Sequence, residues 1–183
     1  MKIKEKNLMK NETIGTVMIT QQQIDKRAEE IARQIERDFD GEEVVLVGIL
    51  RGAVMWMVDI MKNLKLDLTI DFMAVSSYGA STKSSGIVKI NKDLDTDIEG
   101  KNVIIIEDIV DSGTTLNYLK GYFENRDARV VKICALLDKP EGRKTDIDVD
   151  YIGFTVDDRF IVGYGLDYDQ KYRNLPYITY LEE

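Results

Sequence analysis

Residues 103–115 constrain the fold of this chain more than any other stretch. They open with an unbroken run of β-branched residues, 103–106, which is typical of a strand buried on both faces of a parallel sheet. Glu107 and Asp108 follow where we expect such a strand to end, and apolar residues resume at helical spacing from Leu116. The stretch therefore predicts a buried strand, a short polar turn and the start of a helix, in that order.

The polar turn between this strand and this helix predicts an anion-binding site. The first N–H groups of a helix have no partner within the helix and point outward, so they can bind a phosphate. Gly113 lets the backbone approach a ligand closely. The hydroxyl groups of Ser112, Thr114 and Thr115 add hydrogen-bond donors.

Three carboxylates beside such a turn need an explanation. Glu107, Asp108 and Asp111 would repel a phosphate unless a metal ion lies between them, or unless their partners are sugar hydroxyls. A plainer interpretation makes Asp111 and Ser112 the N-cap residues of the helix, and Glu107 with Asp108 a solvated strand end. The complete string of residues favours a ligand site over this combination of local roles.

The rest of the chain alternates strand and helix patterns. Further helices are expected at 20–39 and 53–64, and further strands at 44–49, 68–75, 87–90, 129–138 and 151–156. The small, polar segment 76–86 is expected to be a mobile loop, either an ordinary hairpin connection or a lid. This alternation predicts an α/β fold with a mostly parallel central sheet flanked by helices, and with ligands at the carboxyl ends of the strands.

Composition excludes several classes of protein. Histidine is absent, which removes Ser-His-Asp and Cys-His catalysis and imidazole metal sites. The single Cys134 lies in an apolar strand pattern and is expected to be a small core residue. A net charge of −8 argues against nucleic-acid binding, which depends on a basic face. Because no apolar run approaches a membrane span and no signal peptide is visible, we expect a cytoplasmic protein with no membrane partner.

The string from Val103 to Thr115 resembles the 5-phosphoribosyl-1-pyrophosphate (PRPP) motif of type I phosphoribosyltransferases, a hydrophobic strand followed by E-D-x-x-D-[ST]-G-x-T. The resemblance implies the type I phosphoribosyltransferase fold, with a small hood built from the terminal segments. It implies that Glu107 and Asp108 address the ribose hydroxyls, with Mg²⁺ as the cofactor nearby. It also implies that five consecutive residues wrap the 5′-phosphate, namely Asp111, Ser112, Gly113, Thr114 and Thr115.

Other turns resemble the hypoxanthine-guanine branch of that family, in order and at plausible spacing. These are Leu50-Arg51-Gly52, Ser77-Tyr78-Gly79, Leu137-Asp138-Lys139, and the tail from Phe160 through Asp167 with Arg173. The resemblance implies that Arg51, Gly52 and Arg173 bind pyrophosphate, often with a non-proline cis peptide bond before the basic residue. It implies that Ser77 and Tyr78 belong to a lid over the reacting centre.

The same resemblance implies a purine site. Lys139 would donate to the 6-oxo group, Phe160 would stack on the ring, and Ile161 would contact the base edge through its backbone. Asp167 would lie near a second Mg²⁺ and the guanine amino group, and Asp111 would be the general base at N7. A lysine donor pairs with a 6-oxo group and not with a 6-amino group, which disfavours adenine.

The implied activity is transfer of the phosphoribosyl group from PRPP to hypoxanthine or guanine, which gives IMP or GMP and pyrophosphate in purine salvage. Two alternatives remain at this point: a xanthine-preferring transferase, and a PRPP-binding regulatory protein without catalysis. We expect a single domain, 1–183, with a core at roughly 15–155 and a hood from the N-terminal segment and 156–183. We also expect a homo-oligomer, a dimer or a tetramer, because the Met-rich helix at 53–64 could face a partner subunit as well as a core.

Overall fold

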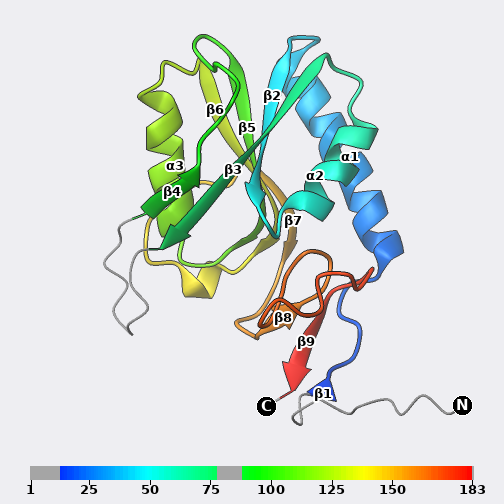
Figure 1. Cartoon of the computed structure of the whole chain (residues 1–183). Coiled ribbons are helices and arrows are strands. Elements are labelled where there is room, and N and C mark those ends of the chain that lie inside the picture. The colour runs from blue at the N-terminus through cyan, green and yellow to red at the C-terminus, as the bar shows by residue number, and fades with distance from the viewer. Residues whose placement is uncertain (1–12, 78–87, 183) are drawn as a thin grey trace, which may run out of the picture.

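The computed structural model of the chain describes residues 13–77 and 88–182, which form a six-stranded sheet, a three-stranded sheet and their covering helices (Figure 1). The strands are β1 (Thr13–Ile14), β2 (Val44–Leu50), β3 (Leu68–Ser77), β4 (Val88–Lys92), β5 (Asn102–Val110), β6 (Val130–Asp138), β7 (Tyr151–Thr155), β8 (Ile161–Val162) and β9 (Thr179–Glu182). The helices are α1 (Gln21–Phe39), α2 (Val54–Asn63) and α3 (Thr114–Glu124), with a short 3₁₀ turn η1 (Pro140–Gly142). None of the helices in the described residues is both long and apolar enough to cross a lipid bilayer.

The larger sheet forms the centre of the fold. Its strand order is β4-β3-β2-β5-β6-β7, and every neighbouring pair is parallel except β3 with β4. Helices α1 and α2 pack together on one face, and α3 packs on the other (Figure 1). The α/β fold with a mostly parallel, helix-flanked sheet is therefore confirmed.

Helix α1 shows how local sequence sets the bounds of an element. Thr20 is its N-cap and forms a capping box, in which the Thr20 side chain accepts from Gln23 N and the Gln23 side chain accepts from Thr20 N. The apolar residues at helical spacing are all buried: Ile24, Ala28, Ile31, Ile35 and Phe39. Asp40 ends the helix in the left-handed region at φ 42°.

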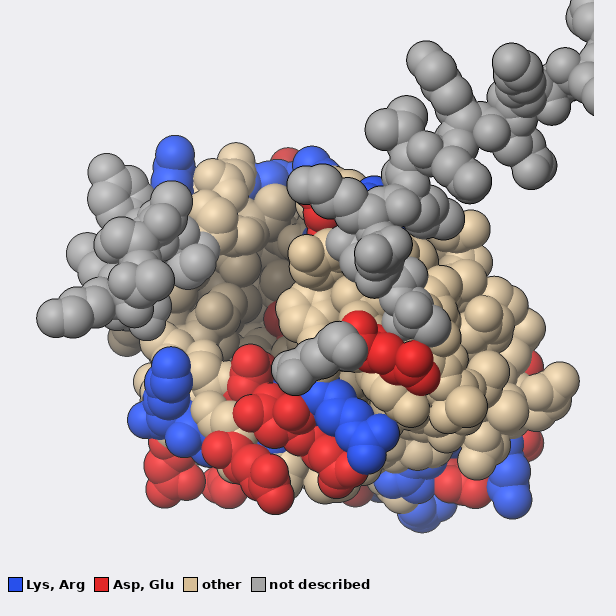
Figure 2. Space-filling view, turned by 90° about the horizontal axis from the view of Figure 1, so that it is seen from below, with Lys and Arg blue, Asp and Glu red and all other residues tan. Residues whose placement is uncertain are grey.

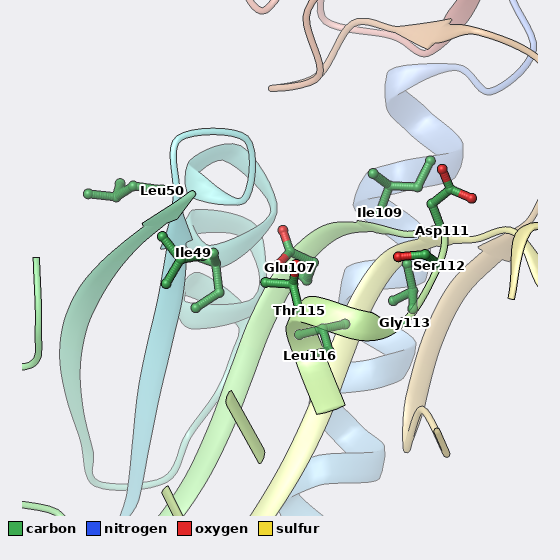
Figure 3. A pocket seen from close by; sticks show the side chains of 11 residues that line it. Ile49, Leu50, Glu107, Ile109, Asp111, Ser112, Gly113, Thr115 and Leu116 are labelled. Atoms are coloured by element: carbon green, nitrogen blue, oxygen red, sulfur yellow. The ribbon is translucent and has the colours of Figure 1, made fainter. Parts of the chain in front are cut away.

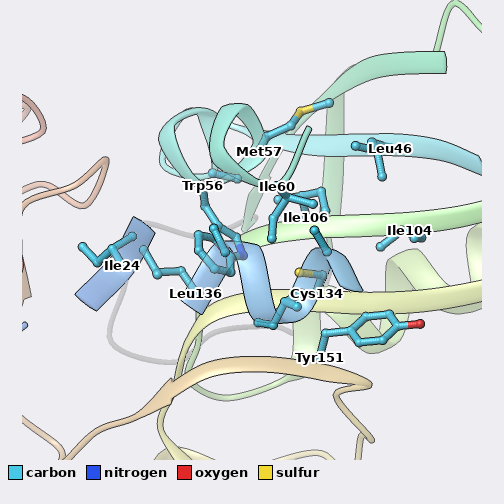
Figure 4. Packing of buried hydrophobic residues seen from close by; sticks show 14 of the residues in the cluster. Ile24, Leu46, Trp56, Met57, Ile60, Ile104, Ile106, Cys134, Leu136 and Tyr151 are labelled. Atoms are coloured by element: carbon cyan, nitrogen blue, oxygen red, sulfur yellow. The ribbon is translucent and has the colours of Figure 1, made fainter. Parts of the chain in front are cut away.

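The core on the α1–α2 face explains the one cysteine and the one tryptophan. Figure 4 shows Trp56 of α2 and Cys134 of β6 among the packed apolar side chains of this layer. Burial raises the pKa of the Cys134 thiol to about 12, so the thiol stays protonated and acts as a small apolar group. Only one face of α2 is core, because Val54 and Val58 are each 41% exposed on its outer side.

Two boundaries differ from the sequence prediction. Strand β5 does not end before Glu107 but runs on to Val110, because its pairing with β6 continues through Val110↔Asp138. Strand β3 likewise includes Ser76 and Ser77, which we had assigned to the mobile loop, because both pair antiparallel with β4. The remainder of the expected loop, including Tyr78, lies outside the described residues.

The smaller sheet is built from both terminal segments, as the family resemblance implied. Strand β9 lies between β1 and β8 and pairs antiparallel with each. Figure 1 shows this sheet beyond the carboxyl ends of β2 and β3, where the arrowheads point. The hood therefore lies over the edge of the main sheet where the sequence places its polar turns.

Candidate active site

The candidate site lies where the chain changes direction across the sheet. Strands β2 and β5 are neighbours, but the chain continues from β2 to β3 on one side and from β5 to β6 on the other. The β2–β5 pairing ends at Gly48↔Ile106, so the two strands stop hydrogen bonding just before Glu107. A crevice at the carboxyl ends of the strands at such a switch point is the usual ligand site of an open α/β sheet.

A cavity of about 270 Å³ occupies this crevice (Figure 3). Ile49 and Leu50 at the end of β2 form one wall, and Glu107 and Ile109 of β5 form its middle. The other wall consists of the turn and the first residues of α3: Asp111, Ser112, Gly113, Thr115 and Leu116. Seen from the hood side, Figure 2 shows a hollow in this face, with Asp and Glu side chains gathered along one rim.

Residues 111–115, here called the phosphate turn, present the N-terminus of α3 to the cavity. The N-cap of α3 is Gly113, in the left-handed region at φ 77°, and the side-chain hydrogen bond at this end of the helix is a long one, from Thr114 N to Ser112 Oγ at 3.4 Å. The carbonyl oxygen of Ser112 accepts from Lys144 N at 3.0 Å and from Thr145 N at 3.2 Å, which fixes the turn from behind. A helix N-terminus held open in this way can bind an anion through its free N–H groups.

The alternative that made Asp111 a helix cap is wrong. The helix begins one residue after Gly113, so the Asp111 carboxylate lies too far ahead of it to cap its first N–H groups. Asp111 instead lies against η1, since a Cβ added to Gly142 would collide with its carboxylate. The Asp111 carboxylate is thus left exposed at the rim of the cavity.

The acid pair on β5 is also not a solvated strand end. Glu107 is 9% exposed and accepts a hydrogen bond from Asp108 N at 3.1 Å. Burial, followed by the negative charge of Asp108, raises the pKa of the Glu107 carboxyl well above its usual range. A buried acid kept so close to a second acid is costly for stability, which is typical of a functional site.

The Arg51 turn touches the acid pair and the tail. The Leu50–Arg51 peptide bond is cis, as the resemblance implied. A Cβ on Gly52 would collide with the Asp108 carboxylate, and a Cβ on Gly165 would collide with the carbonyl oxygen of Gly52. The absence of side chains at these two glycines therefore lets three distant segments of the chain meet.

The tail brings the second arginine to the same place. Arg173 Nη2 lies 2.7 Å from Asp167 Oδ1, and Arg173 Nη1 donates to the carbonyl oxygen of Gly165 at 2.7 Å. The side chain of Gln170 connects both arginines, because its Oε1 accepts from Arg51 at 2.8 Å and from Arg173 at 3.2 Å. The two arginines that sequence reasoning assigned to pyrophosphate thus lie side by side.

Lys139 and Phe160, which the family resemblance assigns to the purine, lie in the turn after β6 and directly before β8. Lys139 N donates to the carbonyl oxygen of Val110 at 2.9 Å, which joins this turn to the end of β5. The Lys139 side chain is only 10% exposed, and its Nζ lies 3.0 Å from Asp158 Oδ1. Phe160 is 54% exposed and packs edge-on against Tyr168, with ring centroids 5.3 Å apart. An exposed aromatic ring can stack on a planar base, and a lysine can donate to an oxygen on the edge of the base.

The carboxylates do not form a preformed metal cluster. Among residues 13–77 and 88–182, no three acidic, histidine or cysteine side chains gather closely enough to hold an ion. Glu107 and Asp108 lie on β5, whereas Asp167 belongs to the tail and is paired with Arg173. This donor set fits Mg²⁺ that arrives with a phosphate ligand, since Mg²⁺ commonly binds one or two carboxylates together with substrate phosphates.

Sequence reasoning missed residues that hold the site together. Arg143 donates to the carbonyl oxygen of Asp111 at 2.8 Å and pairs with the Asp138 carboxylate, which connects the phosphate turn to the end of β6. By contrast, Ile161, which the family resemblance assigns to the edge of the base, is buried in β8 directly after Phe160. Arg143 and Gln170 carry no motif of their own. Their nearness to Lys139 and Arg173 in the chain was the only signal available.

Comparisons with known proteins agree with this geometry. Residues 16–169 match the family model of the phosphoribosyl transferase domain. The hypoxanthine-guanine phosphoribosyltransferase of Bacillus subtilis (strain 168) is 50% identical over 175 residues, which cover 96% of this chain and 97% of that protein. The crystal structure of a hypoxanthine-guanine phosphoribosyltransferase from Bacillus anthracis superposes with a TM-score of 0.89 at 48% identity, covering 92% of this chain and 99% of that one.

A third relative extends the comparison. A hypoxanthine phosphoribosyltransferase structure from Staphylococcus aureus has a TM-score of 0.89 at 46% identity and covers 92% of each chain. The fold and the site first define a class, the α/β proteins that bind a phosphorylated ligand at a switch point. Within that class the chain belongs to the phosphoribosyltransferase family, in its hypoxanthine-guanine branch.

Proposed function

We propose that this chain transfers the 5-phosphoribosyl group of PRPP to hypoxanthine or guanine, giving IMP or GMP and pyrophosphate. One observation carries the proposal: Lys139 N donates at 2.9 Å to the carbonyl oxygen of Val110, the residue directly before the phosphate turn. A sugar phosphate bound at the turn and a base bound at Lys139 would therefore lie at adjacent strand ends. The two reactants would meet between them.

The phosphate turn would bind the 5′-phosphate of PRPP. The N-cap Gly113 has no side chain to cap α3, and the hydroxyls of Ser112, Thr114 and Thr115 lie on the same turn. Glu107 lines the cavity and Asp108 follows it on β5, and we place the ribose hydroxyls beside this pair. Carboxylate oxygens of this pair can accept hydrogen bonds from the sugar hydroxyls.

Arg51, Gly52 and Arg173 would bind the pyrophosphate group of PRPP. Their segments touch at Gly52 and Gly165, and Gln170 accepts from both guanidinium groups, so the two cations lie together. Mg²⁺ bound with PRPP would neutralise the departing pyrophosphate. Glu107 and Asp108 on one side and Asp167 on the other are the residues that would hold such ions.

Lys139 would select the base and Asp111 would move the proton. A lysine donates to the 6-oxo group of hypoxanthine or guanine, and it has no acceptor for the 6-amino group of adenine. Phe160 would stack on the ring, and the backbone of Ile161 would contact its edge. Asp111 would accept the proton from purine N7, while the bond at ribose C1 breaks through an oxocarbenium-like state.

Purified protein with PRPP, Mg²⁺ and each of four bases tests this proposal. We expect IMP from hypoxanthine and GMP from guanine, with negligible product from adenine, and loss of turnover in excess chelator. Faster turnover with xanthine than with either base would make the chain a xanthine-preferring enzyme. PRPP binding without product from any base would instead indicate a regulatory protein.

We further propose one domain, 1–183, that assembles as a dimer or tetramer. Val54 and Val58 support an assembly through α2, because they place two exposed apolar side chains one turn apart on its outer face. Equilibrium ultracentrifugation of the protein and of a Val58→Lys variant would test it. The wild type should sediment as an oligomer and the variant should shift toward the monomer.

A further inference from the structure

We propose that Gln170 is a positioning residue for pyrophosphate: its side-chain oxygen gathers the Arg51 and Arg173 guanidinium groups before PRPP binds. The inference rests on the proposed function, which assigns both arginines to the pyrophosphate group. It adds a residue that carries no charge and belongs to no recognised motif. Its predicted effect is confined to PRPP and pyrophosphate.

The contacts are specific to one oxygen atom. Gln170 Oε1 accepts from Arg51 Nη1 at 2.8 Å and from Arg173 Nη2 at 3.2 Å. In the part of the chain that the structure describes, this is the hydrogen bond that holds the Arg51 guanidinium group. Arg173 has further support from Asp167 and from the carbonyl oxygen of Gly165. Arg51 therefore depends on Gln170 more than Arg173 does.

The charge of the bridging group matters. Two guanidinium groups repel each other, and an oxygen that accepts from both offsets this repulsion. A carboxylate at this position would offset the repulsion more strongly, but it would also cancel part of the positive charge that attracts the pyrophosphate. A neutral amide keeps the cations together without adding a second negative charge to that of Asp167, which already pairs with Arg173.

The backbone around Gln170 is shaped to present this side chain. Tyr168 and Lys171 exchange two hydrogen bonds, at 3.2 and 2.9 Å, so Asp169 and Gln170 are the central residues of a two-residue hairpin turn. Both have positive φ, 48° and 64°, a combination for which asparagine and glycine are preferred. The Gln170 N–H also donates to Asp167 Oδ2 at 2.8 Å. Glycine would suit the Gln170 backbone better, so its side chain is retained at a conformational cost.

Pre-positioned cations lower the ordering cost of binding an anion. Without the bridge, the exposed Arg51 side chain would have to be ordered by PRPP itself. Removal of the Gln170 side chain should therefore weaken PRPP binding and product inhibition by pyrophosphate. The purine site, which uses Lys139 and Phe160, should be unaffected. Because the bridge is exposed to solvent, we expect an effect of several-fold and not of several orders of magnitude.

Gln170→Gly is the sharpest variant, with Asp169→Gly as its matched control. Both substitutions relieve a positive-φ residue in the same turn, but only Gln170→Gly removes the bridging oxygen. We expect Gln170→Gly to raise the KM for PRPP and the inhibition constant of pyrophosphate by roughly 3–10-fold, with the KM for hypoxanthine within about 2-fold of wild type. Asp169→Gly should leave all three constants at wild-type values, and both variants should melt at or above the wild-type temperature.

An Arg51→Ala variant separates this inference from the proposed function. If Arg51→Ala weakens pyrophosphate inhibition and Gln170→Gly does not, the positioning role of Gln170 is overturned and the pyrophosphate assignment stands. If Arg51→Ala itself leaves the inhibition unchanged, the assignment of Arg51 to pyrophosphate fails. In the double variant, Gln170→Gly should add little to the effect of Arg51→Ala, because the bridge acts through Arg51. Fully additive effects would contradict that coupling.

Discussion

The two halves of the proposed site are built in opposite ways. The phosphate turn is one contiguous segment, 111–115, which presents backbone N–H groups and hydroxyls at the start of α3. The pyrophosphate and purine half takes its side chains from distant segments, with Arg51 after β2, Lys139 after β6 and Arg173 in the tail. The first half is contiguous in sequence, and residues 143–145 support it from behind. The second half exists only when the hood and the main sheet are assembled, so long-range contacts set its geometry.

The largest expected effect concerns Asp111, the first residue of the phosphate turn, here called the contiguous half of the site. Asp111→Asn removes the proposed general base and should lower kcat by roughly 10²–10⁴ with little change in the KM for PRPP. Since Gly113 is the N-cap, neither Asp111→Asn nor Asp111→Ala should destabilise the fold by more than about 0.5 kcal/mol. Steady-state kinetics and urea unfolding of both variants check this. Turnover close to wild type in Asp111→Asn would remove Asp111 from the chemistry.

A second, smaller effect should be confined to the pyrophosphate and purine half of the site, here called the assembled half. Lys139→Gln should lower kcat/KM for hypoxanthine and guanine by roughly 10–100-fold, the cost of losing a charged donor to the 6-oxo group. The KM for PRPP should stay within about 2-fold. Lys144→Gln is the matched control, because the Lys144 side chain is exposed and only its backbone supports the phosphate turn. A loss of PRPP affinity with unchanged purine affinity would show that Lys139 serves the other half.

A stability effect should distinguish two glycines of similar backbone conformation. Gly41 and Gly113 have φ values of 84° and 77°, but a Cβ on Gly41 meets nothing, while one on Gly113 would crowd Ile147 and the carbonyl oxygen of Thr145. Gly41→Ala should cost about 1–2 kcal/mol for the left-handed conformation alone. Gly113→Ala should cost at least about 1 kcal/mol more in urea unfolding and should also raise the KM for PRPP. Equal costs would mean that the packing behind the phosphate turn is loose.

The smallest effect is a gain in stability. The folded state raises the Glu107 pKa, so the wild type has its full stability only below the ordinary glutamate pKa and loses some as pH rises through the folded pKa. The Glu107→Gln side chain carries no titratable group, so this loss does not occur in the variant. Its free energy of unfolding should exceed that of the wild type by about 0.5–2 kcal/mol at pH 8, and the difference should shrink toward pH 5. Thermal unfolding across this range measures it. A variant less stable than wild type at pH 8 would show that the buried carboxylate is not a cost.

Sequence could predict the contiguous half much better than the assembled half. The change from the β-branched run to the polar turn and then to the helical pattern predicted β5, the turn and α3 from local chemistry alone. The strand boundary was wrong because pairing with β6 extends β5 to Val110, and no local signal reports a neighbouring strand. The interpretation of Asp111 as the helix N-cap was wrong because Gly113 adopts the left-handed conformation at that position and Asp111 lies outside the helix.

The assembled half was predicted only through family resemblance. Nothing in the local sequence indicates that Arg51 and Arg173 meet at Gln170, because this contact requires Gly52 and Gly165 to let the two segments touch. Arg143 was missed for a related reason, since its role depends on Asp138 and Asp111 being neighbours across two strands. Residues that support a site through long-range contacts carry no spacing pattern of their own.

Titration of PRPP into the protein in the presence of Mg²⁺ tests the division between the two halves most directly. Thr115→Val removes a hydroxyl from the phosphate turn with nearly the same side-chain volume, and Lys139→Gln replaces the proposed charged purine donor with a shorter, neutral side chain. We predict that Thr115→Val raises the dissociation constant of PRPP by roughly 5–10-fold, while Lys139→Gln leaves it within about 2-fold of wild type. A Lys139→Gln protein that binds PRPP as weakly as Thr115→Val would contradict the division and place Lys139 on PRPP.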